Sequence, residues 1–145
     1  MPAIQTNYSE NIRASVPGHI PDMTHADLVS RTVQDAAGLA FGVPVFQGTT
    51  DKSVRAIVNG DTAAKFVGVS VLDRSATGPN GYAQYESARI LLTGPISVTA
   101  TVAVVAGDPV TVSAAGFSNT GGITVPNARW DTSGAAGAVA NIFIK

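Results

Sequence analysis

The sequence has no cysteine, only two histidines, and charged side chains make up just 13% of its 145 residues. Without cysteine the chain forms no disulfide, no thiolate metal site and no thiol nucleophile. The lack of disulfides fits folding in a reducing cytoplasm. Soluble domains average about 25% charged residues, so this surface carries roughly half of the usual charge. The shortage suggests that other protein covers part of the surface.

Two further shortages argue against nucleic acid and membranes as partners. The nine Lys and Arg residues are scattered singly from Arg13 to Lys145, whereas sequence-independent binding of nucleic acid needs several cations facing the phosphates. The most apolar stretch, residues 96–106, contains Ser and Thr and is shorter than the ~20 residues of a membrane helix. The first thirteen residues contain no apolar run, so we expect no signal peptide and synthesis in the cytoplasm without export.

Short alternating runs of Val, Ile, Thr and Ala dominate the rest of the chain, separated by turns rich in glycine and proline. Turn signals at intervals of about 8–12 residues, with no long helical pattern, are typical of an all-β sandwich or barrel. The clearest alternation lies in residues 96–105, where one face is formed by Ile96, Val98, Ala100, Val102 and Val104. The predicted fold class is all-β, a small jelly-roll-like β-sandwich or barrel with an extended N-terminal arm.

The same alternation predicts the individual strands. We expect them in residues 28–33, 43–46, 54–58, 66–72, 82–84, 88–92, 96–105, 110–112, 123–125, 128–131 and 139–144. Gly94 and Pro95 are expected to break the chain between two strands, and Pro44 places its strand at an edge or at its beginning. The closing strand is apolar on both faces and is therefore expected in the centre of a sheet.

Residues 1–23 are expected to form an extended arm, and residues 24–145 a single β-domain. Five apolar residues recur every four positions in the arm: Ile4, Tyr8, Ile12, Val16 and Ile20. This spacing would also line one side of a helix, but prolines at both ends and β-branched side chains oppose a helix. A disordered tail would carry fewer spaced apolar anchors, so the arm is expected to lie along a partner.

One cluster has the residue types of a metal site: His19, Asp22, His25 and Asp27. Imidazole and carboxylate groups together bind zinc or manganese. Prolines and a glycine interrupt their spacing, so no helical face presents the four together. We expect solvated residues of the arm there, with no metal and no cofactor.

Catalytic patterns are equally weak. Ser70 follows Gly68 as in a nucleophile elbow, but the second glycine of that motif is missing. Glu86 is the best isolated acid, and an exposed ion pair with the nearby Arg89 accounts for it. Catalysis needs a positioned acid, base or electrophile, and the sequence offers no such set. The chain is therefore not expected to be an enzyme.

Three aromatic residues outside the arm are candidate contact residues. Tyr82 and Tyr85 flank a turn, and Trp130 is the only tryptophan. Tyrosine, tryptophan and arginine are enriched at interface hot spots. For Trp130 a buried core position and an interface position both remain open.

Several segments resemble the cement (decoration) proteins of tailed bacteriophage capsids. The resemblance lies in the opening Pro2 to Tyr8, in Ser30 to Val33 followed by Gly42 to Val45, in Asp61 to Val71, in Tyr85-Glu86, in the turn Gly107 to Val110 and in the closing strand from Val139. It covers most of the chain as a pattern of strands and turns and includes no catalytic signature.

The resemblance implies a small β-domain with an N-terminal arm that forms dimers or trimers on the outer surface of the capsid. Its partner would be the major capsid protein, and its role would be to cement neighbouring capsid subunits of the mature head. The arm would contact the shell. Two alternatives remain: a carbohydrate-binding or adhesive β-module, with Tyr82, Tyr85 and Trp130 as the aromatic platform, and a small hydrolase that uses His25.

Overall fold

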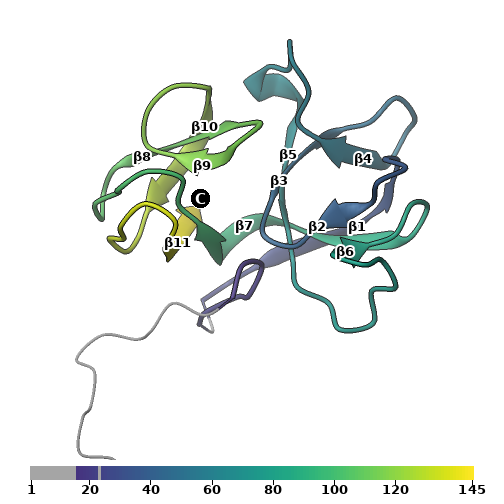
Figure 1. The fold of residues 1–145 in the computed structure, drawn as a ribbon, viewed down its shortest axis with the longest axis horizontal. Helices are drawn as coiled ribbons and strands as arrows, with labels where there is room; N and C mark the ends of the chain where they lie inside the picture. Colours follow the sequence, from purple (N-terminus) through teal and green to yellow (C-terminus); the bar gives the residue numbers. More distant parts are fainter. Residues whose placement is uncertain (1–15, 23) are drawn as a thin grey trace, which may run out of the picture.

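The computed structural model describes residues 16–22 and 24–145, and nearly all of their regular structure is β-strand (Figure 1). In chain order the elements are β1 (Asp27–Val33), β2 (Leu39–Ala40), β3 (Pro44–Gln47), β4 (Ser53–Ala56), the short 3-10 helix η1 (Ala63–Lys65), β5 (Phe66–Ser70), β6 (Gly81–Tyr82), β7 (Ser87–Thr99), β8 (Pro109–Ser113), β9 (Gly116–Ser118), β10 (Ile123–Trp130) and β11 (Val139–Ile144). The predicted all-β fold class is confirmed. Within these residues, no helix has the length and apolar character needed to cross a membrane.

The long strand β7 is common to two rings of strands. The main sheet runs β1-β4-β3-β5-β7-β11-β10-β8-β9, and β1 also pairs with β7. That second pairing closes β1, β4, β3, β5 and β7 into a ring. Ala100, directly after β7, bridges to Phe117 in β9 and closes the other strands into a second ring. We call residues 24–93 the first lobe and residues 94–145 the second lobe; Figure 1 shows them on either side of β7.

β7 runs straight through the predicted break at Gly94 and Pro95, so that prediction is wrong. Residues up to Thr93 pair with β1 and β5, and residues from Gly94 to Thr99 pair with β11. The strand changes partners at Gly94, which has a φ of 125°, and at Pro95, which has no N–H group to donate. A sheet tolerates both residue types at such an irregular position. The strand also ends at Thr99 instead of continuing to residue 105, and Val102 is exposed.

Other strands follow the sequence more closely. The two short strands predicted between residues 123 and 131 are one strand, β10, with a register shift beside Asn127, whose φ is 58°. β11 lies between β7 and β10, as predicted for a central strand. Pro44 is the first residue of β3, which lies between β4 and β5, so the proline marks the beginning of a strand and not an edge.

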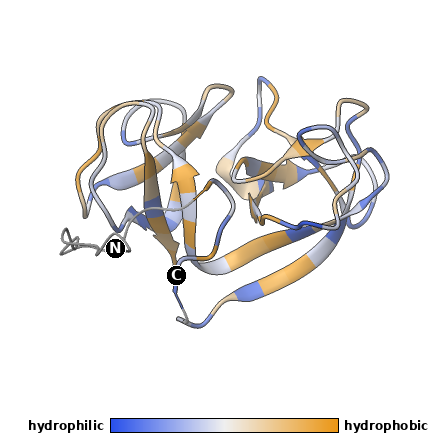
Figure 2. Cartoon of the chain, turned by 60° about the horizontal axis from the view of Figure 1, so that its bottom comes forward, coloured by the Kyte–Doolittle hydropathy of each residue, from blue (hydrophilic) through white to orange (hydrophobic). Residues whose placement is uncertain are grey.

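The apolar core extends through both lobes. One buried cluster lies in the first lobe and consists of Val33, Leu39, Val45, Val54, Tyr82, Ala88 and Ile90. A larger cluster fills the second lobe and includes Phe46, Val69 and Leu91 from the first lobe. Figure 2 shows hydrophobic residues concentrated along the strands of both lobes. The lobes are therefore joined by shared packing as well as by β7.

Candidate interaction surfaces

The predicted metal-like cluster does not converge in the part of it that the structure describes. Among residues 16–22 and 24–145, no group of three or more His, Asp or Glu side chains is placed to hold a metal. His25 Nε2 lies 2.9 Å from Asp27 Oδ1, and both side chains are exposed. Asp22 instead accepts the backbone N–H of Thr24 at 2.8 Å. Hydrogen bonding by the Thr24 side chain, and then by this N–H, lowers the pKa of the Asp22 carboxyl group. These contacts are local and solvated.

Ser70 and Glu86 both hold backbone in place. Ser70 is fully buried; its hydroxyl donates to the carbonyl of Ala40 at 2.7 Å and accepts the N–H of Val43 at 3.1 Å. The structural role predicted for Ser70 is confirmed. The ion pair predicted between Glu86 and Arg89 is wrong, because the Glu86 carboxylate accepts the N–H groups of Ala83 at 2.7 Å and Thr77 at 3.1 Å.

A buried ion pair joins the end of β4 to the loop before η1. Both terminal nitrogens of Arg55 donate to the carboxylate of Asp61, each at 2.7 Å, and only 2% of the Asp61 side chain is exposed. The hydrogen bonds from Arg55 hold the pKa of Asp61 at about 2, with further help from the N–H of Val58. This pair was not among the candidate sites predicted from the sequence. The one feature of the sequence that indicates the pair is the spacing of six residues between Arg55 and Asp61, across the end of a strand and the turn that follows it.

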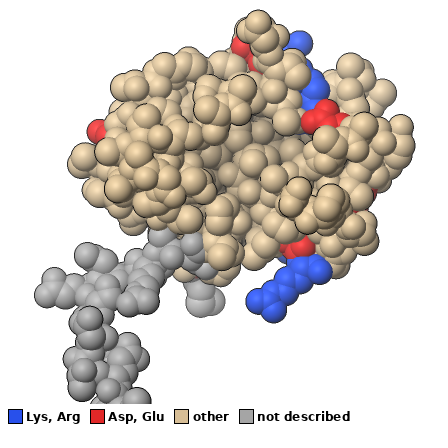
Figure 3. All heavy atoms as spheres, viewed as in Figure 1, with Lys and Arg blue, Asp and Glu red and all other residues tan. Residues whose placement is uncertain are grey.

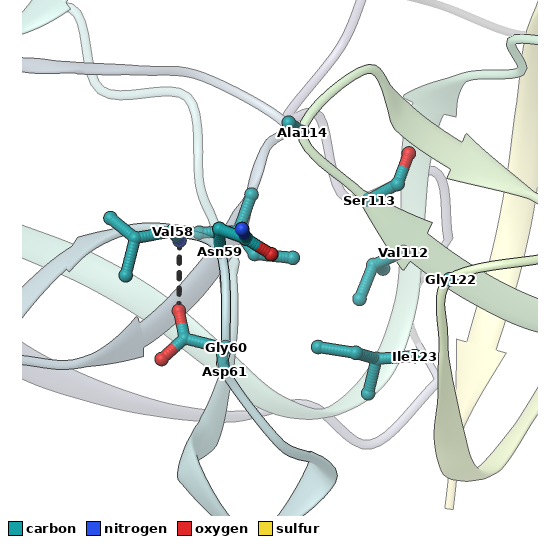
Figure 4. A pocket seen from close by; sticks show the side chains of 10 residues that line it. Val58, Asn59, Gly60, Asp61, Val112, Ser113, Ala114, Gly122 and Ile123 are labelled. Atoms are coloured by element: carbon teal, nitrogen blue, oxygen red, sulfur yellow. Dashed lines mark hydrogen bonds between the residues drawn. The ribbon is translucent and has the colours of Figure 1, made fainter.

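A cleft of about 360 Å³ lies between the lobes next to this ion pair (Figure 4). The loop after β4 forms one wall with Ile57 to Asp61, and Val112, Ser113 and Ile123 face it from β8 and β10. A second hollow of about 210 Å³ adjoins it and shares Ile57, Ser113 and Ala114. The walls are mostly apolar, and Asp61 is occupied by Arg55 and by the N–H of Val58. The cleft therefore presents packing surface in place of a reactive group.

The described end of the arm is fixed to the body at Gly18 and His19. Gly18 donates its N–H to the carbonyl of Ser97 at 2.8 Å, and Ser97 donates back to the carbonyl of His19 at 2.9 Å. Leu72 donates its N–H to the carbonyl of Gly18 at 2.8 Å. The fit requires glycine, because Gly18 has a φ of 87° and an added Cβ would lie 2.9 Å from the nitrogen of Leu72. Gly18 and His19 are thus held at a defined point beside β7.

The surface of the second lobe carries very little charge. Its charged residues are Asp108, Arg129, Asp131 and Lys145. Exposed positions are instead occupied by small or apolar residues such as Val102, Val105, Ala114, Ala115, Ala135 and Ala136. In Figure 3 this lobe, on the left, is almost entirely tan, whereas charged groups gather on the first lobe. The charge shortage of the chain is therefore concentrated on one lobe.

The predicted contact residues fall into three groups. Ile4, Tyr8 and Ile12 lie outside the described residues. Val16 is 51% exposed, whereas Ile20 is partly buried and packs against the core. Tyr85 is 76% exposed and is the most exposed of the large hydrophobic residues in the described chain.

Tyr82 and Trp130 are core residues. This corrects the prediction of Tyr82 as a surface contact, and of the two positions left open for Trp130 the structure shows the buried one. The Tyr82 hydroxyl donates to the carbonyl of Val71 at 2.6 Å, and its ring packs edge-on against Phe41. The Trp130 ring is fully buried and donates its Nε1–H to the carbonyl of Ser118 at 3.2 Å. Because two of the three rings are buried, the aromatic platform required by the carbohydrate-binding alternative is not formed by these residues.

Comparison with known proteins identifies a family that matches nearly the whole chain. The family model described as "Structural cement protein (E217 gp24/Pam3 gp6)" matches residues 4–145. No curated protein matches the sequence. A chain from "The capsid of Myoviridae Phage XM1" has the same fold, with a TM-score of 0.74 and 16% identity over 99% of this chain and 98% of that one.

A second similar structure is the head fiber gp8.5 N base of bacteriophage phi29, with a TM-score of 0.46 and 10% identity over 83% of this chain and 95% of that chain. Its likeness is too low to support an argument. The family match spans both lobes, β7 and the anchor at Gly18, so it covers every surface described above. The chain belongs to the structural cement protein family of bacteriophages.

Proposed function

We propose that this protein binds the outside of the assembled capsid and cements neighbouring major capsid subunits, stabilising the mature head. The observation that carries the proposal is the family match over residues 4–145. The role requires adhesion and no chemical step, and we further propose that the protein is not an enzyme. Its self-association as a dimer or trimer is part of the same proposal.

The geometry supports adhesion at more than one place. The described end of the arm is held against β7 at Gly18 and His19, and backbone groups of an arm are able to add a strand to a neighbouring sheet. The second lobe offers a broad surface of low charge, which is inexpensive to desolvate against protein. An oligomer that holds several capsid subunits combines weak contacts into strong retention.

Binding to the assembled shell alone stabilises the shell by mass action. At a free concentration one hundred times the dissociation constant, each occupied site contributes about 2.7 kcal/mol. Cryo-microscopy of the mature phage head tests the location directly. Density for this β-fold on the outer surface, between capsid subunits, is the expected result; heads that lack it there contradict the proposal.

A deletion tests whether the arm holds the shell. Removal of residues 1–15 retains the hydrogen bonds of Gly18 and His19, so we expect a folded protein whose melting temperature is within a few degrees of the full chain. Binding to heads assembled without this protein is expected to weaken at least tenfold, as measured by cosedimentation.

The matched control retains the length of the arm and changes only its apolar residues. In this variant Ile4, Tyr8 and Ile12 are each replaced by serine. A loss of binding equal to that of the deletion assigns the contact to the apolar side chains. Full binding by the deletion variant shows that the arm is not the clamp.

A further inference from the structure

Two large exposed side chains occupy backbone conformations that favour glycine. Lys52 has a φ of 59° and Tyr85 a φ of 65°. Each is the third residue of a four-residue turn: Ser53 donates its N–H to the carbonyl of Thr50, and Glu86 donates to Ala83, both at 3.2 Å. A positive φ at the third position of such a turn selects Gly or Asn.

The third positive-φ residue of the described chain that is not glycine gives a contrast. Asn127, with a φ of 58°, is a residue type that enters the left-handed region readily. Lysine and tyrosine enter it at a larger cost in stability. Such outliers persist where the surrounding structure fixes them, and they cluster at functional sites.

The two turns flank the same end of the first lobe. Thr32, near the end of β1, donates its N–H to the carbonyl of Lys52 at 3.0 Å. On the other side of β1, Tyr85 donates its N–H to the carbonyl of Val33 at 2.8 Å, and Val33 donates to Glu86 at 3.0 Å. One strand spacing of about 4.8 Å on either side of β1 places the two backbones roughly 10 Å apart.

Side-chain hydrogen bonds brace both turns. In the Lys52 turn, the Ser53 hydroxyl donates to the carbonyl of Thr50 at 2.7 Å and accepts its N–H at 3.1 Å. The Glu86 carboxylate accepts the N–H groups of Ala83 and Thr77, and the Gln84 side chain donates to the carbonyl of Gln34 at 3.1 Å. Yet 76% of Tyr85 is exposed, so its ring adds little to the packing of its own chain. The fold therefore carries strain at a residue from which it gains no core contact.

We propose that Tyr85 and Lys52 form a preformed contact pair that docks onto the shell protein. A tyrosine ring on a rigid turn contributes a large contact area at low entropic cost. The complementary surface is an apolar pocket that receives the ring, with a carboxylate at its border that receives the Lys52 ammonium group. The inference rests on the proposed function and adds the part of the first lobe that meets the shell.

The test uses the full-length chain and heads assembled without it. Tyr85→Asn removes the ring and places a suitable residue at positive φ, so we expect the melting temperature to rise by about 2–4 °C. The dissociation constant for heads is expected to rise at least about tenfold, as for a hot-spot tyrosine. Lys52→Asn is expected to raise the melting temperature as well, to weaken binding about threefold, and to reduce its salt dependence.

Val58→Asn is the matched control, because Val58 is 52% exposed in the first lobe and is not among the residues at positive φ. Val58→Asn is expected to raise neither the melting temperature nor the dissociation constant for heads. If Tyr85→Asn binds heads as tightly as the unmodified chain does, the contact pair is overturned and the proposed function still stands. A lowered melting temperature shows that the ring is structural and also overturns it.

Two further outcomes are distinguishable. A change in the mass of the free protein on Tyr85→Asn, measured by light scattering, assigns the ring to contacts between copies of this chain and overturns its assignment to the shell. Failure of the unmodified chain to bind heads is a failure of the proposed function itself.

Discussion

Arg55 and Asp61 form the buried ion pair of a chain that carries few charges. Their contact is bidentate, with both N–O distances at 2.7 Å, and the two side chains are 13% and 2% exposed. Charges buried in this way are costly when one partner is removed, because the other is left without compensation. The pair fixes the loop that forms one wall of the interlobe cleft.

Replacing Asp61 with asparagine is expected to destabilise the protein by about 2 kcal/mol, the scale of hydrogen bonds to a charged group. Urea denaturation measures the change. The exposed pair of His25 and Asp27 provides the control, since Asp27→Asn in a solvated pair should cost less than about 1 kcal/mol. Equal effects of the two substitutions would show that burial of the first pair contributes nothing.

The same carboxyl group predicts a loss of stability in acid. The pKa of Asp61 is lowered from 3.8 to about 2, so the unfolded chain binds its proton first as the pH falls. The contribution of Asp61 is therefore fully present above pH 4 and is lost as the pH falls from about 4 towards 2. Denaturation curves across this range should be less steeply pH-dependent for Asp61→Asn than for the unmodified chain.

The fate of the aromatic residues shows what sequence could not decide at this scale. Tyr85 was predicted as a surface residue from its type and its turn, and it is exposed. Tyr82 lies in the same turn region, but its hydroxyl donates to the carbonyl of Val71 and its ring packs against Phe41. Such partners come from other segments of the chain, so neighbouring residues in the sequence do not distinguish a ring with a buried partner from one without.

At the scale of elements, alternation predicted where strands are but not where they join. In the prediction, glycine and proline marked the limits of strands. Pro44 was expected at an edge or at the beginning of its strand, and it is the first residue of β3. The prediction was wrong at Gly94 and Pro95, because β7 exchanges β1 and β5 for β11 there and continues. The strand pairs with partners on two lobes that lie at least 20 positions away along the chain, and local pattern does not report such pairings.

The attachment of the arm to the body depends on one glycine, Gly18. Gly18→Ala meets both a positive φ and the nearby nitrogens of Leu72 and Gly42. Gly60 has a similar φ of 91°, yet a Cβ there meets nothing within 4 Å. We expect Gly60→Ala to cost about 1–2 kcal/mol from backbone strain alone, and Gly18→Ala to cost about 1–3 kcal/mol more from overpacking.

Two measurements separate these effects. Urea denaturation gives the difference in stability, and limited proteolysis followed by mass spectrometry reports cleavage near residue 18. Faster cleavage near that position in Gly18→Ala, with no such change in Gly60→Ala, is the expected result. Identical costs for the two variants would contradict the close packing of Gly18 against Leu72.

At the scale of the whole molecule, the two lobes share β7, and the larger buried cluster includes Phe46, Val69 and Leu91 of the first lobe, so the lobes should unfold together. Val54 is fully buried in the first lobe, and Trp130 is a fluorescent reporter buried in the second. Val54→Ala is expected to cost about 2 kcal/mol through the cavity that it leaves. The Trp130 transition and the circular dichroism transition should both move to lower urea by the same amount.

Independent behaviour of the lobes would have a clear signature. The Trp130 transition would stay in place while the circular dichroism transition became broader or split. That result would contradict a single cooperative unit. The sequence contains nothing that predicts either outcome, because the closure of each ring depends on pairings between distant strands such as β1 with β7.

The bonding of Gly18 and His19 to Ser97 has a mechanical consequence. Tension applied to the arm enters the molecule at Ser97, near the end of the one strand that both rings have in common, and at Leu72 in the first lobe. Such a load is divided between two closed rings, instead of peeling a terminal strand from a free border. Under the proposed function, a head that swells under the pressure of its genome would thus pull on both lobes at once.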